Sequence, residues 1–273
     1  DGLAAVLRDD SLDPAFRALL LRLPSEEDTA QAIFDGGGTP DPSAINQAHE
    51  TLKLHIAQHL QDMLPRIYAQ MTVTGPYKPD AVSAGKRAFG NAALSLISKL
   101  DGGKQAAAQF ATANNMTQQL GALRALLMIS KGQQELVAFE DQWQHDRLVM
   151  DKWFSAQCIS SVSSVENVRS LMQHELFSMT NPNRIRSVIG SFSQNSIQFH
   201  CQEGYQLLTE VIIELDQLNP QIAARFAGIY NHWRRFTAQY SKLQESQLNS
   251  IIQSDNLSKD VYEIIHSALK GKV

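Results

Sequence analysis

Two histidines four residues apart have a spacing that could bind a metal. His55 and His59 lie at positions i and i+4 of a predicted helix, the spacing at which His-Glu-x-x-His motifs bind zinc. The position of the general-base Glu in such a motif holds Ile56, and a third ligand after a gap of eighteen residues would fall on Lys78. Zinc catalysis needs three convergent protein ligands. We therefore interpret the pair as histidines at the edge of the core, with His59 on the apolar stripe of its helix, and predict no metal ligands.

Nucleophilic chemistry has equally little support. Cys158 and Cys201 are too few for a disulfide framework, which favours a reducing compartment. We interpret both as buried or incidental, since free cysteine commonly behaves as a small hydrophobic residue. A Gly-x-Ser-x-Gly elbow and a phosphate-binding loop are missing, and the glycines at 36–38 are typical of a flexible turn. The sequence predicts no catalytic residues.

Arginine and glutamine side chains remain as candidates for binding. Arg184 and Arg186 flank the apolar face of a predicted helix that begins at Pro182, on opposite edges. Gln221 and Arg225 share one edge of another predicted helix. Such side chains could bind a carboxylate, for which arginine is well suited. Solvation at the surface, or an internal ion pair for the arginines, is the alternative.

A further basic segment, Trp233-Arg234-Arg235, stands alone. It is more consistent with a cation over an aromatic ring, or with an ion pair, than with a nucleic-acid patch. The formal net charge of -4 gives no general attraction to nucleic acid or to anionic lipid. No apolar run approaches the ~20 residues of a membrane helix, so we expect neither a nucleic-acid partner nor a membrane.

Helices must position these residues. Asp13-Pro14, Asp41-Pro42, Asn181-Pro182 and Asn219-Pro220 each precede a periodic apolar run, and Ser25 to Asp28 resembles a capping box. The predicted helical runs are 42–71, 81–100, 104–113, 117–130, 132–158, 163–177, 182–193, 204–218, 220–236, 238–253 and 258–269. Pro65 should kink the first of them or end it one turn earlier.

The order of these elements predicts the fold class. About a dozen helices joined by short connections favour antiparallel neighbours. We predict an all-α, right-handed α-solenoid of stacked antiparallel helix pairs, similar to HEAT or armadillo repeats. A single irregular helical bundle is the alternative, because no repeat of fixed period is visible.

Short motifs resemble a known family and keep that family's order along the chain. They are Lys86-Arg87 with Asn91, Ala-Asn-Asn-Met-Thr at 113–117, Leu-Val-Met-Asp-Lys-Trp-Phe at 148–154, Asn-Pro-Asn-Arg-Ile-Arg-Ser at 181–187, Phe199-His200, Asn-Pro-Gln at 219–221, Leu257-Ser258 and Val261-Tyr262. Together they resemble the C-terminal domain of bacterial aminopeptidase N, a zinc metallopeptidase of the gluzincin class. The resemblance is most specific over 86–235 and at the C-terminus, and it is collinear but weaker over 1–80.

The resemblance implies that residues 1–273 form one helical C-terminal domain whose catalytic domain, with its zinc, lies upstream and outside this chain. The start at Asp1, without a signal peptide, is expected for such a fragment of a cytoplasmic enzyme. The parent would remove N-terminal residues from peptides, and this domain would cover the active-site cavity. Matching positions assign substrate binding to Arg186, Gln221 and Arg225, without catalysis. Here Gly204-Tyr205 follows Phe199-His200 after a shorter loop than the family has, so no role is transferred to that loop.

A stand-alone helical-repeat scaffold that binds a protein partner is the alternative function. The two differ in what surrounds the chain, because an aminopeptidase requires an upstream His-Glu-x-x-His motif in the same reading frame.

Overall fold

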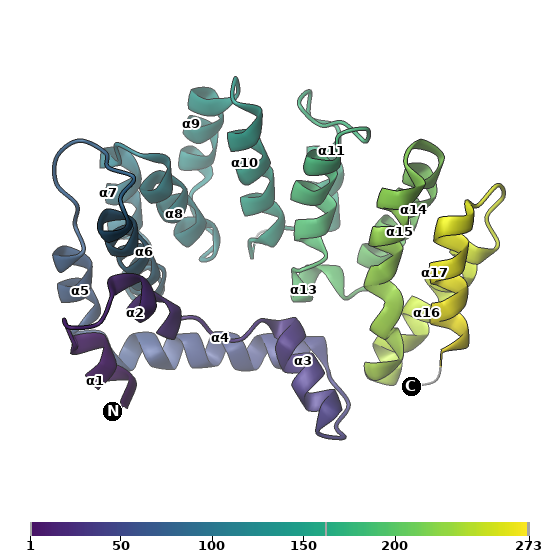
Figure 1. Cartoon of the computed structure of the whole chain (residues 1–273), viewed down its shortest axis with the longest axis horizontal. Helices are drawn as coiled ribbons and strands as arrows, with labels where there is room; N and C mark the ends of the chain where they lie inside the picture. Colours follow the sequence, from purple (N-terminus) through teal and green to yellow (C-terminus); the bar gives the residue numbers. More distant parts are fainter. Residues whose placement is uncertain (1, 162, 272–273) are drawn as a thin grey trace. The chain divides into compact units, whose positions relative to one another are not determined.

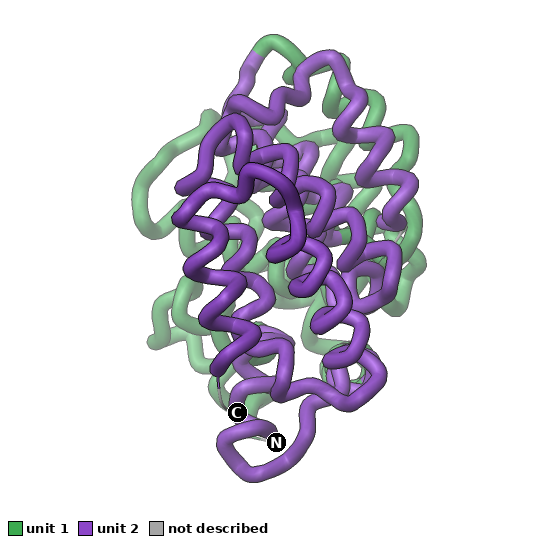
Figure 2. Tube along the Cα trace, turned by 90° about the vertical axis from the view of Figure 1, so that its right-hand side faces the viewer, with its two compact units in different colours: residues 1–24, 48–145, 160–162 green, residues 25–47, 146–159, 163–273 purple. Residues whose placement is uncertain are grey.

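The computed structural model describes residues 2–161 and 163–271, and in these residues the structure contains helices and no strands (Figure 1). The predicted all-α class is therefore confirmed. The chain divides into two compact units (Figure 2), of which unit 1 holds residues 1–24, 48–145 and 160–162 and unit 2 holds the remainder. None of the described helices is both long and apolar enough to span a membrane.

The described residues form 17 α-helices, together with one π-helical segment and one 3₁₀ segment. Unit 1 contains α1 (Gly2–Arg8), α2 (Pro14–Leu20), most of α4 (Pro42–His59), α5 (Leu64–Gln70), α6 (Ala81–Asp101), α7 (Lys104–Thr112), α8 (Met116–Leu127) and α9 (Gln133–Trp143). Unit 2 contains α3 (Glu26–Asp35), the start of α4, α10 (Arg147–Ile159), α11 (Val165–Met172), α12 (Pro182–Ile185), the π segment η1 (Arg186–Gly190), α13 (Ser196–Phe199), α14 (Gln202–Leu218), α15 (Pro220–Ala227), the 3₁₀ segment η2 (Gly228–Arg235), α16 (Ala238–Ile252) and α17 (Lys259–Lys270).

The helices are more numerous than the predicted dozen because some predicted runs are interrupted and because α1 and α13 lie outside the predicted runs. The run 42–71 breaks after His59 and resumes at Leu64, which confirms the effect expected of Pro65. The run 132–158 consists of α9 and α10. The run 220–236 changes from α to 3₁₀ geometry at Gly228 and has a kink at His232. Apolar periodicity continues through such breaks, so periodicity alone did not reveal them.

All five predicted helix starts are confirmed. The Asp13 side chain accepts a hydrogen bond from the backbone N–H of Ala15, and Asp41 accepts one from Ala44. Ser25 and Asp28 form the reciprocal bonds of a capping box. The asparagine caps at 181 and 219 belong to the candidate site described below. Side-chain oxygens at these positions satisfy N–H groups that a helix start leaves without an intrahelical partner.

Unit 1 has its core around α6, which packs against α2, α5, α7 and α8. Phe89 and Ala93 on α6 are fully buried against Ala57, Leu60 and Leu64. Unit 2 has α14 packed against α15 and α16, while α10 packs against η1. Helices that follow one another or lie two apart in the chain account for much of this packing, as expected for stacked helix pairs, while α2 packs on the more distant α6.

The last helix of unit 2 is fixed by a buried carboxylate. Asp216 on α14 is only 3% exposed and accepts hydrogen bonds from the backbone N–H and the hydroxyl of Ser258, the former at 2.7 Å. Ser258 in turn caps α17 by accepting from the Val261 N–H. The start of α17 is thereby tied to α14.

Candidate functional site

Two asparagine caps set the register of the segments that hold the predicted binding residues. The Asn181 side-chain oxygen accepts from the N–H groups of Asn183 at 3.0 Å and Arg184 at 3.3 Å. The Asn219 oxygen accepts from the N–H of Ile222 at 3.2 Å. In both helices proline follows the cap, where its missing N–H costs no hydrogen bond. These local contacts fix where α12 and α15 begin.

Arg184 lies inside unit 2. Its side chain is 2% exposed, its Nε lies 3.3 Å from Oδ1 of Asp151, and its guanidinium carbon lies 4.6 Å from the centre of the Phe154 ring. Burial lowers the pKa of Arg184, and the Asp151 charge opposes this shift. The alternative of an internal ion pair is therefore confirmed for this residue. Its partners belong to α10, which local helical periodicity cannot identify.

Arg186, Gln221 and Arg225 are all exposed, as predicted from their positions off the apolar faces. Arg186 is the first residue of η1, and Gln221 and Arg225 are one turn apart on α15. Their side chains make no hydrogen bond or ion pair with any residue in 2–161 or 163–271. They are consequently available to a ligand.

The Arg186 side chain and a side chain of α15 both lie beside Gly190. A Cβ atom placed on Gly190 would lie 3.7 Å from Cγ of Arg186 and 3.7 Å from Cε1 of Phe226. The aliphatic part of Arg186 and the ring that follows Arg225 in sequence thus lie beside the same glycine. The π-helical turn at 186–190 and α15 are neighbours at this point.

The chemistry open to this group is binding. Two guanidinium groups can each hold a carboxylate through paired N–H···O bonds, and the Gln221 amide can donate to a carbonyl or accept from an N–H. A nucleophile with an adjacent base, which covalent catalysis requires, is absent from these three residues.

The predicted histidine pair is exposed. His55 and His59 both lie on the solvent side of α4, whereas Ala57 and Leu60 are buried. Leu52, which periodicity placed on the apolar stripe, is 46% exposed. The assignment of His59 to the apolar stripe is therefore wrong, because the core of unit 1 receives a face of the helix rotated away from it. No group of three His, Cys, Asp or Glu residues suited to a metal occurs in the described part of the chain.

The two cysteines differ in environment. Cys158 is buried, and burial raises the pKa of its thiol to about 12, so little thiolate exists near neutral pH. Cys201 is half-buried and caps α14 by accepting from the Gly204 N–H at 3.3 Å. Its thiol also donates to the Gln198 carbonyl at 3.3 Å, and burial raises its pKa. Both residues have structural roles here.

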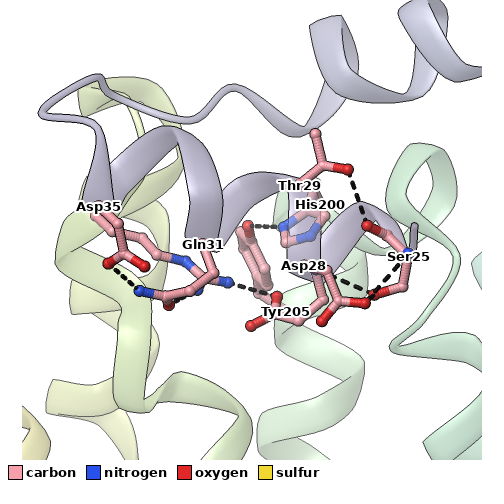
Figure 3. Close-up of polar contacts among 9 residues, drawn as sticks. Ser25, Asp28, Thr29, Gln31, Asp35, His200 and Tyr205 are labelled. Atoms are coloured by element: carbon pink, nitrogen blue, oxygen red, sulfur yellow. Dashed lines mark hydrogen bonds and ion pairs between the residues drawn. The ribbon is translucent and has the colours of Figure 1, made fainter.

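A second polar group joins η2 to α3, through an ion pair that was one of the two alternatives predicted for the basic segment. Arg235 forms an ion pair with Glu27 and donates to Gln31 at 2.9 Å. Figure 3 shows Gln31 and Asp35 on α3, with the hydrogen-bonded pair His200 and Tyr205 nearby. The sequence distance between Arg235 and α3 exceeds 200 residues, so no local signal could have indicated the contact.

The aromatic alternative for the basic segment is also confirmed. The Arg234 guanidinium lies 4.2 Å from the centre of the Trp233 ring, and that of Arg235 lies 4.8 Å from the Phe236 ring. Arg234 additionally donates to the carbonyl groups of Ala268 and Leu269 near the end of α17. These contacts hold the end of unit 2 together.

Near this group His200 is kept neutral. Its Nδ1 lies 2.6 Å from the Tyr205 hydroxyl. Burial lowers the pKa of His200 to about 4, and the positive charge of Arg235 acts in the same direction. Burial also raises the pKa of Tyr205 well above its ordinary value. At neutral pH both groups are therefore uncharged.

Comparison with known proteins covers essentially the whole chain. Residues 1–270 match the family model described as "Domain of unknown function (DUF3458_C) ARM repeats". Aminopeptidase N of Caulobacter vibrioides is 37% identical over 98% of this chain and 32% of its own length, and aminopeptidase N of Escherichia coli is 36% identical over 98% of this chain and 31% of its length. The chain thus spans about a third of the length of these relatives.

A solved structure is also similar to nearly the whole of this chain. The crystal structure of Legionella pneumophila aminopeptidase A in complex with aspartic acid superposes with a TM-score of 0.86 at 27% sequence identity, over 97% of this chain and 32% of that chain. The predicted resemblance is confirmed: the chain belongs to the family of ARM-repeat domains (DUF3458_C) and corresponds to the C-terminal part of aminopeptidase N proteins.

Proposed function

We propose that residues 1–273 are the C-terminal domain of a zinc-dependent, cytoplasmic aminopeptidase that removes N-terminal residues from peptides. Support for an upstream catalytic domain in the same polypeptide comes from the relatives, of which this chain covers only about a third. In this proposal the domain covers the active-site cavity and positions the peptide, while bond cleavage belongs to the catalytic domain.

Zinc would be bound outside this chain. The described residues provide no suitable set of ligands, and His55 and His59 lack a third convergent partner. We therefore assign no step of the reaction to a metal held by this domain.

The observation that carries the proposal is the exposed, unpaired group on η1 and α15. The polar atoms of Arg186, Gln221 and Arg225 are not engaged by any residue that the structure describes, and Arg186 lies beside α15 at Gly190. Such side chains can bind backbone carbonyls or the terminal carboxylate of a peptide. Their role is to orient the substrate away from the scissile bond, which accelerates a reaction through positioning.

The test compares two substrates in the full-length polypeptide. Substituting Arg186→Ala together with Arg225→Ala should lower kcat/KM for a pentapeptide by about tenfold or more, because two charge-assisted contacts are lost. Hydrolysis of alanine p-nitroanilide should change little, since this substrate is too short to reach the pair. Steady-state kinetics on both substrates measure the difference.

Lys242→Ala, an exposed cation on α16, is the control for a general change in charge and should leave both substrates unaffected. Equal losses on the long and the short substrate in the double variant would contradict a positioning role. An upstream stop codon without a His-Glu-x-x-His motif in frame would contradict the aminopeptidase itself.

A further inference from the structure

Unit 2 contains a cavity that lies apart from Arg186, Gln221 and Arg225. Its volume is about 580 Å³, and its walls come from α3, the start of α4, the segment around α13, η2 and α16. This volume falls within the range of small-molecule sites, which are clefts of roughly 300–1,000 Å³. None of the three residues proposed to bind peptide lines it.

Three buried polar atoms that have no hydrogen-bond partner among the described residues belong to side chains that line this cavity. They are Oε2 of Glu26, Nε of Arg235 and Nε2 of Gln244. Buried polar groups in folded proteins are nearly always hydrogen-bonded, and leaving one unpaired costs about 1–3 kcal/mol. Their gathering around a single cavity therefore points to a molecule that supplies the missing partners.

The acceptor is the carboxyl group of Glu26, which the described residues leave without an ion pair. One oxygen of Glu26 accepts from Nδ2 of Asn46 at 2.8 Å, while the other oxygen, Oε2, is buried and unpaired. Glu26 forms no ion pair with any residue that the structure describes. Its position in the first turn of α3 is favourable for a carboxylate, yet the helix end gives no donor to Oε2. An ammonium group would supply both the charge and the hydrogen bond.

The two donors, on Gln244 and Arg235, belong to side chains that are more deeply buried than Glu26. Gln244 on α16 is 2% exposed and Arg235 is 5% exposed. Arg235 uses its terminal nitrogens for Glu27 and Gln31, which leaves Nε free. The Gln244 amide lies near Tyr205, where it opposes the rise that burial causes in the pKa of that hydroxyl, but Nε2 makes no hydrogen bond of normal geometry. A carboxylate or carbonyl oxygen would satisfy these donors.

Apolar groups complete the wall. Phe199 and Phe236 are buried, and Ile45 and Ala30 belong to the small core cluster between α3 and α16. A site that offers an anionic acceptor, two N–H donors and apolar side chains matches a ligand with an ammonium group, a carboxylate and a hydrocarbon side chain.

We propose that this cavity is a binding site for a zwitterionic amino acid or short peptide. Glu26 holds the ammonium group, Arg235 and Gln244 hold the carboxylate, and Phe199 and Phe236 contact the side chain. This inference does not depend on the aminopeptidase proposal, because every residue it uses lies in unit 2 of this chain.

The test is isothermal titration of the full 273-residue chain with L-leucine and with the dipeptide Leu-Leu. We expect saturable binding of at least one of them. N-acetyl-leucine, which lacks the ammonium group, and isoamylamine, which lacks the carboxylate, should each bind about tenfold or more weakly, since each loses a charge-assisted hydrogen bond.

Two variants locate the site. Gln244→Leu and Glu26→Gln should each weaken binding by about tenfold, whereas Gln253→Leu, at the exposed residue that follows α16, should leave binding unchanged. Gln244→Leu preserves volume and removes an unpaired buried amide, so its melting temperature should not fall, which separates lost binding from lost folding. Absence of saturable binding by both zwitterions, or undiminished binding in Gln244→Leu and Glu26→Gln, would overturn the proposal.

Discussion

Two arginines in adjacent turns of unit 2 occupy opposite environments. Arg184 is buried against Asp151 and Phe154 of α10, whereas Arg186 is exposed at the start of η1 and has no partner in the described residues. Two residues of the same type therefore differ in role: Arg184 stabilises the interior, whereas Arg186 is exposed to solvent. The comparison shows that sequence type alone does not distinguish a structural arginine from one available to a ligand.

The two environments have different consequences for the stability of the folded state. A buried charge that loses its partner remains in a medium that solvates it poorly, so removing one member of a buried pair is costly. An exposed arginine is solvated by water, and its removal changes stability little. Folding stability and ligand binding should consequently depend on different arginines.

Arg184→Ala is expected to have the largest effect. It should lower the free energy of unfolding by about 3 kcal/mol, because Asp151 loses its charge partner and Phe154 loses its stacked neighbour. Urea denaturation followed by circular dichroism measures the change.

The matched control is Arg186→Ala, which should alter stability by less than about 0.5 kcal/mol. Arg184→Met should lose less than Arg184→Ala, since an unbranched chain keeps part of the packing on Phe154. Similar losses of unfolding free energy in Arg184→Ala and Arg186→Ala would contradict the difference expected between a buried and an exposed arginine.

His200 extends the comparison to pH. Its pKa is about 4 in the folded chain and near 6.5 in the unfolded chain, so between these values the unfolded chain binds a proton that the folded chain does not. Its contribution is present above pH 6.5 and is lost as the pH falls toward 4. At pH 4.5 the loss should be about 2 kcal/mol.

Urea titrations at pH 7 and pH 4.5 measure this loss. Carboxylates titrate in the same range, so the informative quantity is the difference between the wild type and His200→Gln. We expect a weaker pH dependence in the variant. An unchanged pH dependence would mean that His200 is not held neutral by its surroundings.

The caps of the two binding segments should have the smallest effects. Asn181→Ala and Asn219→Ala should each cost about 1 kcal/mol, because each removes the acceptor for backbone N–H groups at a helix start. Asn183→Ala, which removes an exposed side chain beside the first cap, is the control and should be nearly neutral. Thermal unfolding of the three variants tests this, and a cap substitution as mild as the control would refute it.

Prediction from the sequence was most successful for features that depend on a few neighbouring residues. An Asx-Pro pair contains both its acceptor and the proline suited to the next position, so Asn181 and Asn219 could be recognised without any tertiary information. The break before Leu64 followed from Pro65 for the same reason. The change of α15 into a 3₁₀ segment at Gly228 has no such local marker, because the apolar residues continue at similar spacing.

Prediction of the site was partial. The exposure of Arg186, Gln221 and Arg225 followed from their places on helical wheels, and their proposed role came from family resemblance. The exposure of His59 was mispredicted, and the burial of Arg184 in an ion pair was predicted only as an alternative, because a wheel identifies a face without identifying what packs against it.

By itself, the sequence determined the all-helical class, the helix starts and the family, since each depends on short stretches of residues or on their order. Tertiary structure alone decided which polar groups are buried and what they meet. Arg235 pairs with Glu27 across more than 200 residues, and Gln244 shares a cavity with Glu26. Such partners are chosen by packing, which brings distant segments together according to the shape and volume of the whole core.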